Sequence, residues 1–184
     1  RSIPGMVVMS PADDVEARAM VRAAYEYVGP VYMRFGRAGV PVFHDEASYT
    51  FQIGKGEVLR EGTDVAIIAN GLMVAEALAA AETLAGMGIS AQVINMATIK
   101  PLDEELVLQA AKTCGKVITC EEHSVIGGLG EAVCGLLSEK CPTPVRRIGV
   151  NDEFGHSGPA GALLKQFGLS AEHIVEVAKD FCGK

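Results

Sequence analysis

Two arginines lie close together after a short apolar segment near the N-terminus. The run Val31–Phe35 contains Arg34, and Arg37 follows two residues later. A guanidinium group binds phosphate or carboxylate through two parallel hydrogen bonds, so arginines near one strand end suit an anionic ligand. A surface ion pair is equally compatible with this spacing. From the residues alone, Arg37 is the candidate for an anion contact.

A second polar group combines carboxylates, an imidazole and glycines. Glu121, Glu122 and His123 precede the run Gly127-Gly128-Leu129-Gly130. Two carboxylates beside an imidazole could perform acid–base chemistry, and a glycine-rich helix entry could cradle a phosphate. The run lacks the G-x-G-x-x-G spacing and the P-loop lysine. We therefore predict Glu122, His123 and Gly128 as interface or anion contacts, with a purely structural turn as the alternative.

Two further turns carry weaker signals. Asp152, His156 and Ser157 are too close in sequence to aim at one another as a catalytic triad requires, and no G-x-S-x-G elbow is present. We predict a loop and helix cap there. Asn70-Gly71 could offer backbone amides to an anion or form a plain strand-to-helix turn. No His, Cys or Asp spacing matches a metal site, and we assign no catalytic residue.

Strands and helices alternate along most of the chain, and this order would position these groups. The predicted strands are 6–9, 31–35, 57–60, 65–69, 91–96, 117–120 and 145–150, and the predicted helices begin at Pro11, Met73, Pro101, after Gly130, at Pro159 and at Ala171. Such alternation is typical of a mostly parallel sheet with helices on both faces. The predicted fold class is therefore α/β, with a three-layer αβα arrangement. Ligands of such sheets bind beyond the carboxyl ends of the strands.

The chain divides into two stretches. Residues 1–42 form a strand–helix–strand unit that is too small to be stable alone, with Ser10 as the expected helix N-cap before Pro11. Residues 43–56 contain Gly and charged residues without periodicity, and we predict a linker. Residues 57–184 carry the fuller α/β series.

Composition excludes several classes of protein. Of the 184 residues, 49% are hydrophobic and 21% charged, which is typical of a globular domain. The net charge of −7 opposes nonspecific binding to nucleic acid or an anionic membrane. No apolar run could span a bilayer. The five cysteines form no C-x-x-C pair, and we expect reduced thiols in a cytoplasmic protein.

Four segments, in order, resemble transketolases. Residues 1–13 are similar to the R-S-(I/L)-P-N-x-x-V-x-x-P-A-D stretch of that family, and residues 29–41 resemble the strand and arginine turn that close its pyrimidine-binding domain. Residues 121–130 and 149–158 resemble its C-terminal domain. The resemblance covers nearly the whole chain and is closest to the split bacterial transketolases, whose catalytic unit is built from two polypeptides.

This resemblance implies a function for the complete enzyme. Transketolases transfer a two-carbon ketol unit between sugar phosphates with thiamine diphosphate and a divalent metal (Mg²⁺), bound at a dimer interface. Arg37 matches the arginine that contacts the substrate phosphate. Residues 1–42 match the end of the pyrimidine-binding domain, and residues 57–184 match the C-terminal domain.

The same resemblance implies a partner. The family's pyrimidine-binding Glu and its Asp-Gly-Pro-Thr-His stretch precede the segment at which this chain begins. We therefore expect a fragment that binds no cofactor alone, is inactive alone, forms a homodimer and needs an N-terminal transketolase subunit or domain. The alternatives are part of a deoxyxylulose-phosphate synthase, part of a 2-oxo acid dehydrogenase beta subunit, or a non-catalytic dimerisation or nucleotide-binding module.

Overall fold

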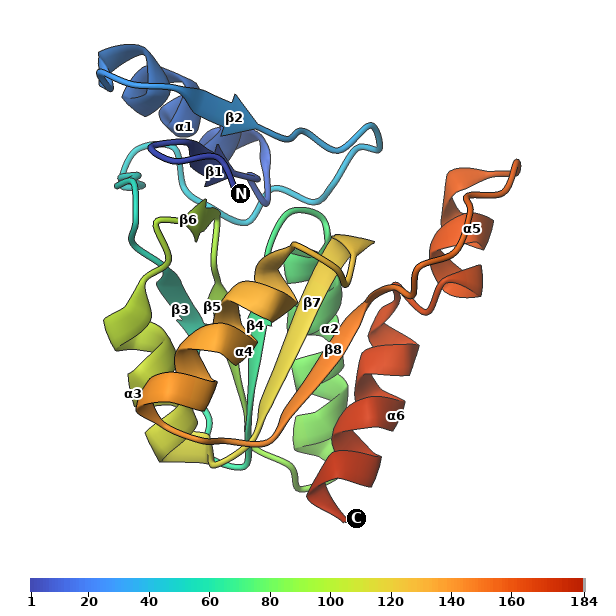
Figure 1. Ribbon diagram of the computed structural model, residues 1–184. Helices are drawn as coiled ribbons and strands as arrows, with labels where there is room; N and C mark the ends of the chain where they lie inside the picture. The colour runs from blue at the N-terminus through green and yellow to red at the C-terminus, as the bar shows by residue number, and fades with distance from the viewer. Residues whose placement is uncertain (184) are drawn as a thin grey trace.

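A five-stranded sheet forms the centre of the protein in the computed structural model, which describes residues 1–183 (Figure 1). Its strands, in spatial order, are β3 (Glu57–Arg60), β5 (Ala91–Asn95), β4 (Val65–Ala69), β7 (Val117–Ser124) and β8 (Val145–Val150). The last four are parallel, and β3 pairs antiparallel with β5 at the edge. The predicted mostly parallel sheet is confirmed.

Helices cover both faces of this sheet. Helices α2 (Met73–Gly86) and α6 (Ala171–Cys182) pack on one face, and α3 (Glu104–Cys114) and α4 (Leu129–Lys140) pack on the other (Figure 1). The fully buried strand β4 sends alternate side chains to the two sides: Ile67 joins the α2–α6 core, whereas Ile68 joins the α3–α4 core. This is the three-layer αβα arrangement.

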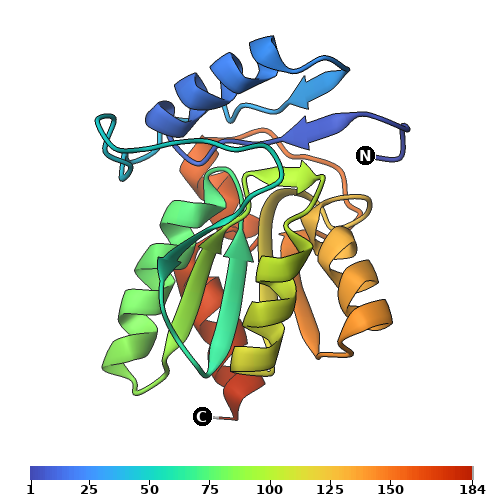
Figure 2. The same ribbon diagram turned by 90° about the vertical axis from the view of Figure 1, so that its left-hand side faces the viewer.

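A smaller sheet lies across the carboxyl ends of these strands (Figure 2). It has the order β2 (Val31–Met33), β1 (Val7–Met9) and β6 (Thr98–Lys100), and helix α1 (Asp14–Glu26) connects β1 to β2. Strand β6 was not predicted, because three residues are too few to show a periodicity. It pairs antiparallel with β1, so a strand of the second stretch completes the sheet of the first.

Two helices, α1 and α3, each start three residues later than the sequence predicts. Helix α1 begins at Asp14, and its N-cap is Asp13, whose Oδ1 accepts the Glu16 N–H at 2.9 Å. The predicted cap, Ser10, is instead tied to the smaller sheet, since its N–H donates to the Ala97 carbonyl. Helix α3 likewise begins at Glu104 after the N-cap Asp103, rather than at Pro101.

Two strands end at other residues than the sequence predicts. Strand β7 continues to Ser124 instead of ending at Cys120, so Glu121, Glu122 and His123 extend a strand. Residues 34–56 contain no helix or strand, so β2 ends two residues earlier than predicted. The short helix α5 (Ala160–Gln166) has no buried residue and projects from the rest of the protein (Figure 1).

Candidate functional site

The loop of residues 34–42, called the arginine loop below, carries both arginines out of β2. At its start, the Arg34 N–H donates to the Met9 carbonyl at 2.9 Å, and the Arg34 guanidinium lies 3.4 Å from the Glu122 carboxylate. Arg37 is exposed and has no hydrogen bond or ion pair within residues 1–183. The ion-pair alternative therefore applies to Arg34, and Arg37 is the arginine left available for a ligand.

One cavity of about 780 Å³ brings together residues that lie in separate segments of the sequence. Arg37, Glu122 and His123 all line it, although they come from two distant parts of the chain. His156, assigned from sequence only to a loop, also lines it, and its ring packs edge-on against Phe167 at 5.7 Å. We call this space the Arg37 cavity. The sequence offered one indication of this placement: His156 follows the last parallel strand, and ligands of such sheets bind beyond the carboxyl ends of the strands.

His123 has one ring nitrogen engaged within the chain. Its Nδ1 lies 2.7 Å from the Ser124 carbonyl, which can only accept, so Nδ1 carries the proton of this bond. In the neutral ring Nε2 is then an acceptor, and in the protonated ring it is a donor. Because the side chain is half exposed at the edge of the cavity, it can serve a ligand in either form.

The glycine-rich turn already holds an anion of the chain itself. Glu121 is 2% exposed, and its carboxylate accepts the N–H groups of Leu129 and Gly130, both at 2.8 Å, at the start of α4. Burial raises the pKa of Glu121 above its usual value, against the opposing effect of these two bonds. A Cβ at Gly128 would lie 2.7 Å from the Glu121 Cδ. Glycine here makes room for a buried helix cap, and these two amides are not free for an external phosphate.

The sequence analysis considered Glu121 as one of two carboxylates beside an imidazole, but assigned only Glu122 and His123 of these three as interface or anion contacts. Strand alternation explains the difference, since Glu121 points inward while Glu122 reaches Arg34. The nearby turn at Asn70 is also engaged within the fold: its N–H donates to the Cys120 carbonyl at 3.2 Å.

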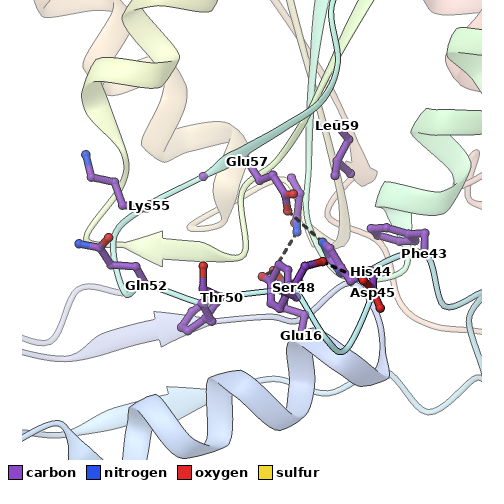
Figure 3. Close-up of a pocket in the computed structure, with 14 residues that line it drawn as sticks. Glu16, Phe43, His44, Asp45, Ser48, Thr50, Gln52, Lys55, Glu57 and Leu59 are labelled. Atoms are coloured by element: carbon purple, nitrogen blue, oxygen red, sulfur yellow. Dashed lines mark hydrogen bonds and ion pairs between the residues drawn. The ribbon is translucent and has the colours of Figure 1, made fainter.

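A buried polar cluster joins the two stretches and was not predicted (Figure 3). The His44 ring lies between two carboxylates, with Nδ1 3.0 Å from Asp13 and Nε2 2.9 Å from Glu57. Glu16 accepts from the Tyr49 hydroxyl at 2.5 Å and the Asn95 amide at 2.8 Å. All of these residues except Asp13 line a cavity of about 450 Å³.

The neighbouring groups and burial shift the pKa values of the ionisable residues in this cluster. Burial would lower the pKa of His44, but its hydrogen bond to Glu57, its close contact with Asp13 and the charges of Asp13 and Glu16 raise it to about 9. Burial raises the pKa of Glu16. For Asp13, burial acts upward but is outweighed by the bonds from Glu16, His44 and Phe43, so its pKa is lowered. At neutral pH the ring is therefore an imidazolium.

Two kinds of feature are absent from the described part of the chain. Within residues 1–183, no group of three or more His, Cys, Asp or Glu side chains could hold a metal ion. No helix of these residues combines the length and the apolar composition needed to cross a membrane.

Comparisons with known proteins agree on one family. The family model described as "Transketolase, C-terminal domain" matches residues 54–174. The chain is 49% identical over 180 residues to the 6-deoxy-6-sulfo-D-fructose transketolase subunit SqwH of Clostridium sp. (strain MSTE9), covering 98% of this chain and 56% of that protein. It is 46% identical over 178 residues to a putative transketolase C-terminal section of Methanocaldococcus jannaschii, covering 96% and 55%.

A more distant relative and a solved structure extend this agreement. A 1-deoxy-D-xylulose-5-phosphate synthase of Heliobacterium modesticaldum is 43% identical, with 98% of this chain and 28% of that enzyme covered. A structure titled "Split gene transketolase, inactive beta4 tetramer" matches with a TM-score of 0.94 and 49% identity, covering 98% and 59%. The chain thus spans little more than half the length of its first two relatives. It belongs to the transketolase family and carries that family's C-terminal domain.

Proposed function

We propose that this chain is the C-terminal part of a transketolase subunit, in an assembly that transfers a two-carbon ketol unit between sugar phosphates. The observation that carries this proposal is the match, over 98% of the chain at a TM-score of 0.94, to a protein titled a split gene transketolase. The deoxyxylulose-phosphate synthase relative is less similar than the two transketolase relatives.

In this proposal Arg37 binds the phosphate of the sugar substrate. Its guanidinium has no partner within residues 1–183 and lines a cavity large enough for a small anionic ligand. Arg34 and Glu122 neutralise each other at 3.4 Å, so Arg37 supplies the uncompensated positive charge of the loop. Glu122 and His123 border the same cavity, where they could contact the ligand or a neighbouring subunit.

The cofactor is assigned to the complete assembly. Thiamine diphosphate supplies the carbanion chemistry that ketol transfer requires. Because the chain matches the C-terminal part of transketolase subunits and covers little more than half of its first two relatives, we infer that a partner subunit or domain holds the diphosphate and its Mg²⁺. This chain would bind and orient the phosphorylated end of the substrate, in a cytoplasmic assembly that includes a second copy and an N-terminal transketolase subunit.

The test is a steady-state comparison in the assembled enzyme. Losing a charge-assisted contact of about 1.5–3 kcal/mol should raise the KM for phosphorylated sugars roughly 10- to 100-fold in Arg37→Ala. Activity with a donor that lacks phosphate should stay unchanged. The matched control is Arg22→Ala, which removes an exposed arginine of α1. An unchanged KM for phosphorylated substrates would refute the assignment of Arg37.

A further inference from the structure

The arginine loop is fixed only at its two ends. No backbone hydrogen bond involves residues 35–42 anywhere in the described chain. The loop also spans a hollow of about 270 Å³ between itself and the first turn of α1, lined by Asp14 and Ala17. Neither internal hydrogen bonding nor tight packing therefore sets the place of Arg37. Its position depends on what holds the loop at residue 34 and at residue 43.

The downstream end is held by a buried carboxylate, and the Phe43 side chain there also packs against the α2–α6 core. Asp13 Oδ2 accepts the N–H of Phe43 at 3.0 Å and the N–H of His44 at 2.9 Å. Its other oxygen, Oδ1, accepts the Glu16 N–H and so caps α1. The Asp13 side chain is fully buried, and hydrogen bonds to a buried carboxylate are not exposed to competition from water. The loop end is thereby attached to the start of α1.

The His44 ring extends this attachment to the five-stranded sheet. Its Nδ1 faces Asp13 at 3.0 Å, and its Nε2 bonds Glu57 at 2.9 Å, as the dashed line in Figure 3 shows. Glu57 opens β3, where it pairs with Asn95 of β5. A single imidazolium therefore links the arginine loop, α1 and the edge of the large sheet. Its side chain is only 4% exposed and that of Asp13 is fully buried, so water has little access to the contact between them, whereas the Glu57 carboxylate is partly open to solvent.

We propose that His44, together with Asp13 and Glu57, is a positioning residue that fixes the downstream end of the arginine loop and so sets where Arg37 presents its guanidinium. The consequence for phosphate binding rests on the function proposed above. The positioning itself does not, because it concerns contacts within this chain. His44 touches neither substrate nor cofactor in this proposal.

Limited proteolysis tests the positioning without any activity measurement. Trypsin cleaves after Arg37, and Lys112 in α3, on the far side of the sheet, gives an internal reference. In the full chain, His44→Ala should speed cleavage after Arg37 roughly tenfold relative to Lys112, because the loop end opens locally. The matched control is His173→Ala, which removes a half-exposed histidine of α6. Unchanged cleavage after Arg37 in a folded variant would overturn the proposal.

If His44→Ala does not fold, the milder variant Glu57→Gln tests the same proposal. Glu57 is 45% exposed, so Glu57→Gln removes one charge from the link without burying an unpaired group. Far-UV circular dichroism would establish that the variant is folded. We expect a smaller but measurable increase in cleavage after Arg37, and no increase in a folded Glu57→Gln protein would also count against the proposal.

Kinetics of the assembled enzyme separate this proposal from the proposed function. A displaced Arg37 should raise the KM for phosphorylated sugars about tenfold in His44→Ala, with kcat nearly unchanged. If cleavage after Arg37 accelerates and this KM rises, both proposals are supported. If cleavage accelerates but the KM stays the same, the positioning stands and the phosphate role of Arg37 fails.

Discussion

Replacing Gly128 by alanine should destabilise the protein by displacing the buried cap of α4. The backbone at Gly128 has φ −93°, which any residue adopts, so the cost does not come from backbone strain. The new Cβ would lie 2.7 Å from Cδ and 2.9 Å from Oε1 of Glu121. The carboxylate can move away only by giving up its bonds to the N–H groups of Leu129 and Gly130.

The size of the effect follows from those two bonds. Each is a charge-assisted bond from a backbone amide, worth about 1.5–3 kcal/mol, and loss of a helix cap alone costs about 1 kcal/mol. Water can replace part of the loss at a helix end. We therefore expect a decrease of about 2–4 kcal/mol in the free energy of unfolding, measured by urea denaturation at constant m-value.

Two further variants isolate the cause. Gly135 lies in the middle of α4, and a Cβ added there would meet no atom within 4 Å, so Gly135→Ala should stabilise the protein by about 0.5–1 kcal/mol. In a Glu121→Ala background, Gly128→Ala should cost little, because the clashing carboxylate is gone. A change below about 0.5 kcal/mol for Gly128→Ala in the wild-type background would refute this account of the turn.

Two other predictions concern charge. Because the pKa of His44 is raised to about 9, its stabilisation is complete below the unfolded value near 6.5 and is lost as the pH rises through 9. The melting temperature should therefore fall between pH 6.5 and 9 more steeply than in His44→Gln, and parallel curves would contradict the assignment. The Arg34–Glu122 pair is about one-third exposed, so Glu122→Gln should change the unfolding free energy by less than about 1 kcal/mol, as urea denaturation would show.

The layered fold could be predicted from the sequence because its strands and helices are long enough to show their periods. Val65–Ala69 is predicted as a buried strand from its own residues, and the structure buries all five. Strand β6 could not be found this way, since Thr98–Lys100 is a strand only by virtue of pairing with β1. Its conformation is determined by a partner far away in the chain.

The candidate site likewise combines features that the local sequence predicts with features that only distant contacts determine. Arg37, Glu122 and His123 were identified by residue type, but only the fold shows that they line one cavity. The N-cap of α1 was assigned to Ser10, although Asp13 was an equally good capping residue. What favours Asp13 is a pair of amides about thirty positions later, at Phe43 and His44. The residues around Asp13 in the sequence give no indication of a contact with amides so far away in the chain.

The pairing of β1 with β6 has a consequence for how the chain folds during synthesis. The partner of Met9 is Thr98, so strand β1 leaves the ribosome long before the strand that completes its sheet. At about 5–20 residues per second, strand β1 waits roughly 5 to 20 seconds for β6 to be synthesised. Throughout that interval β1 presents free backbone groups to any other strand nearby, including those of other nascent chains. A chaperone that covers this edge of β1 until residues 98–100 have emerged would prevent such pairing.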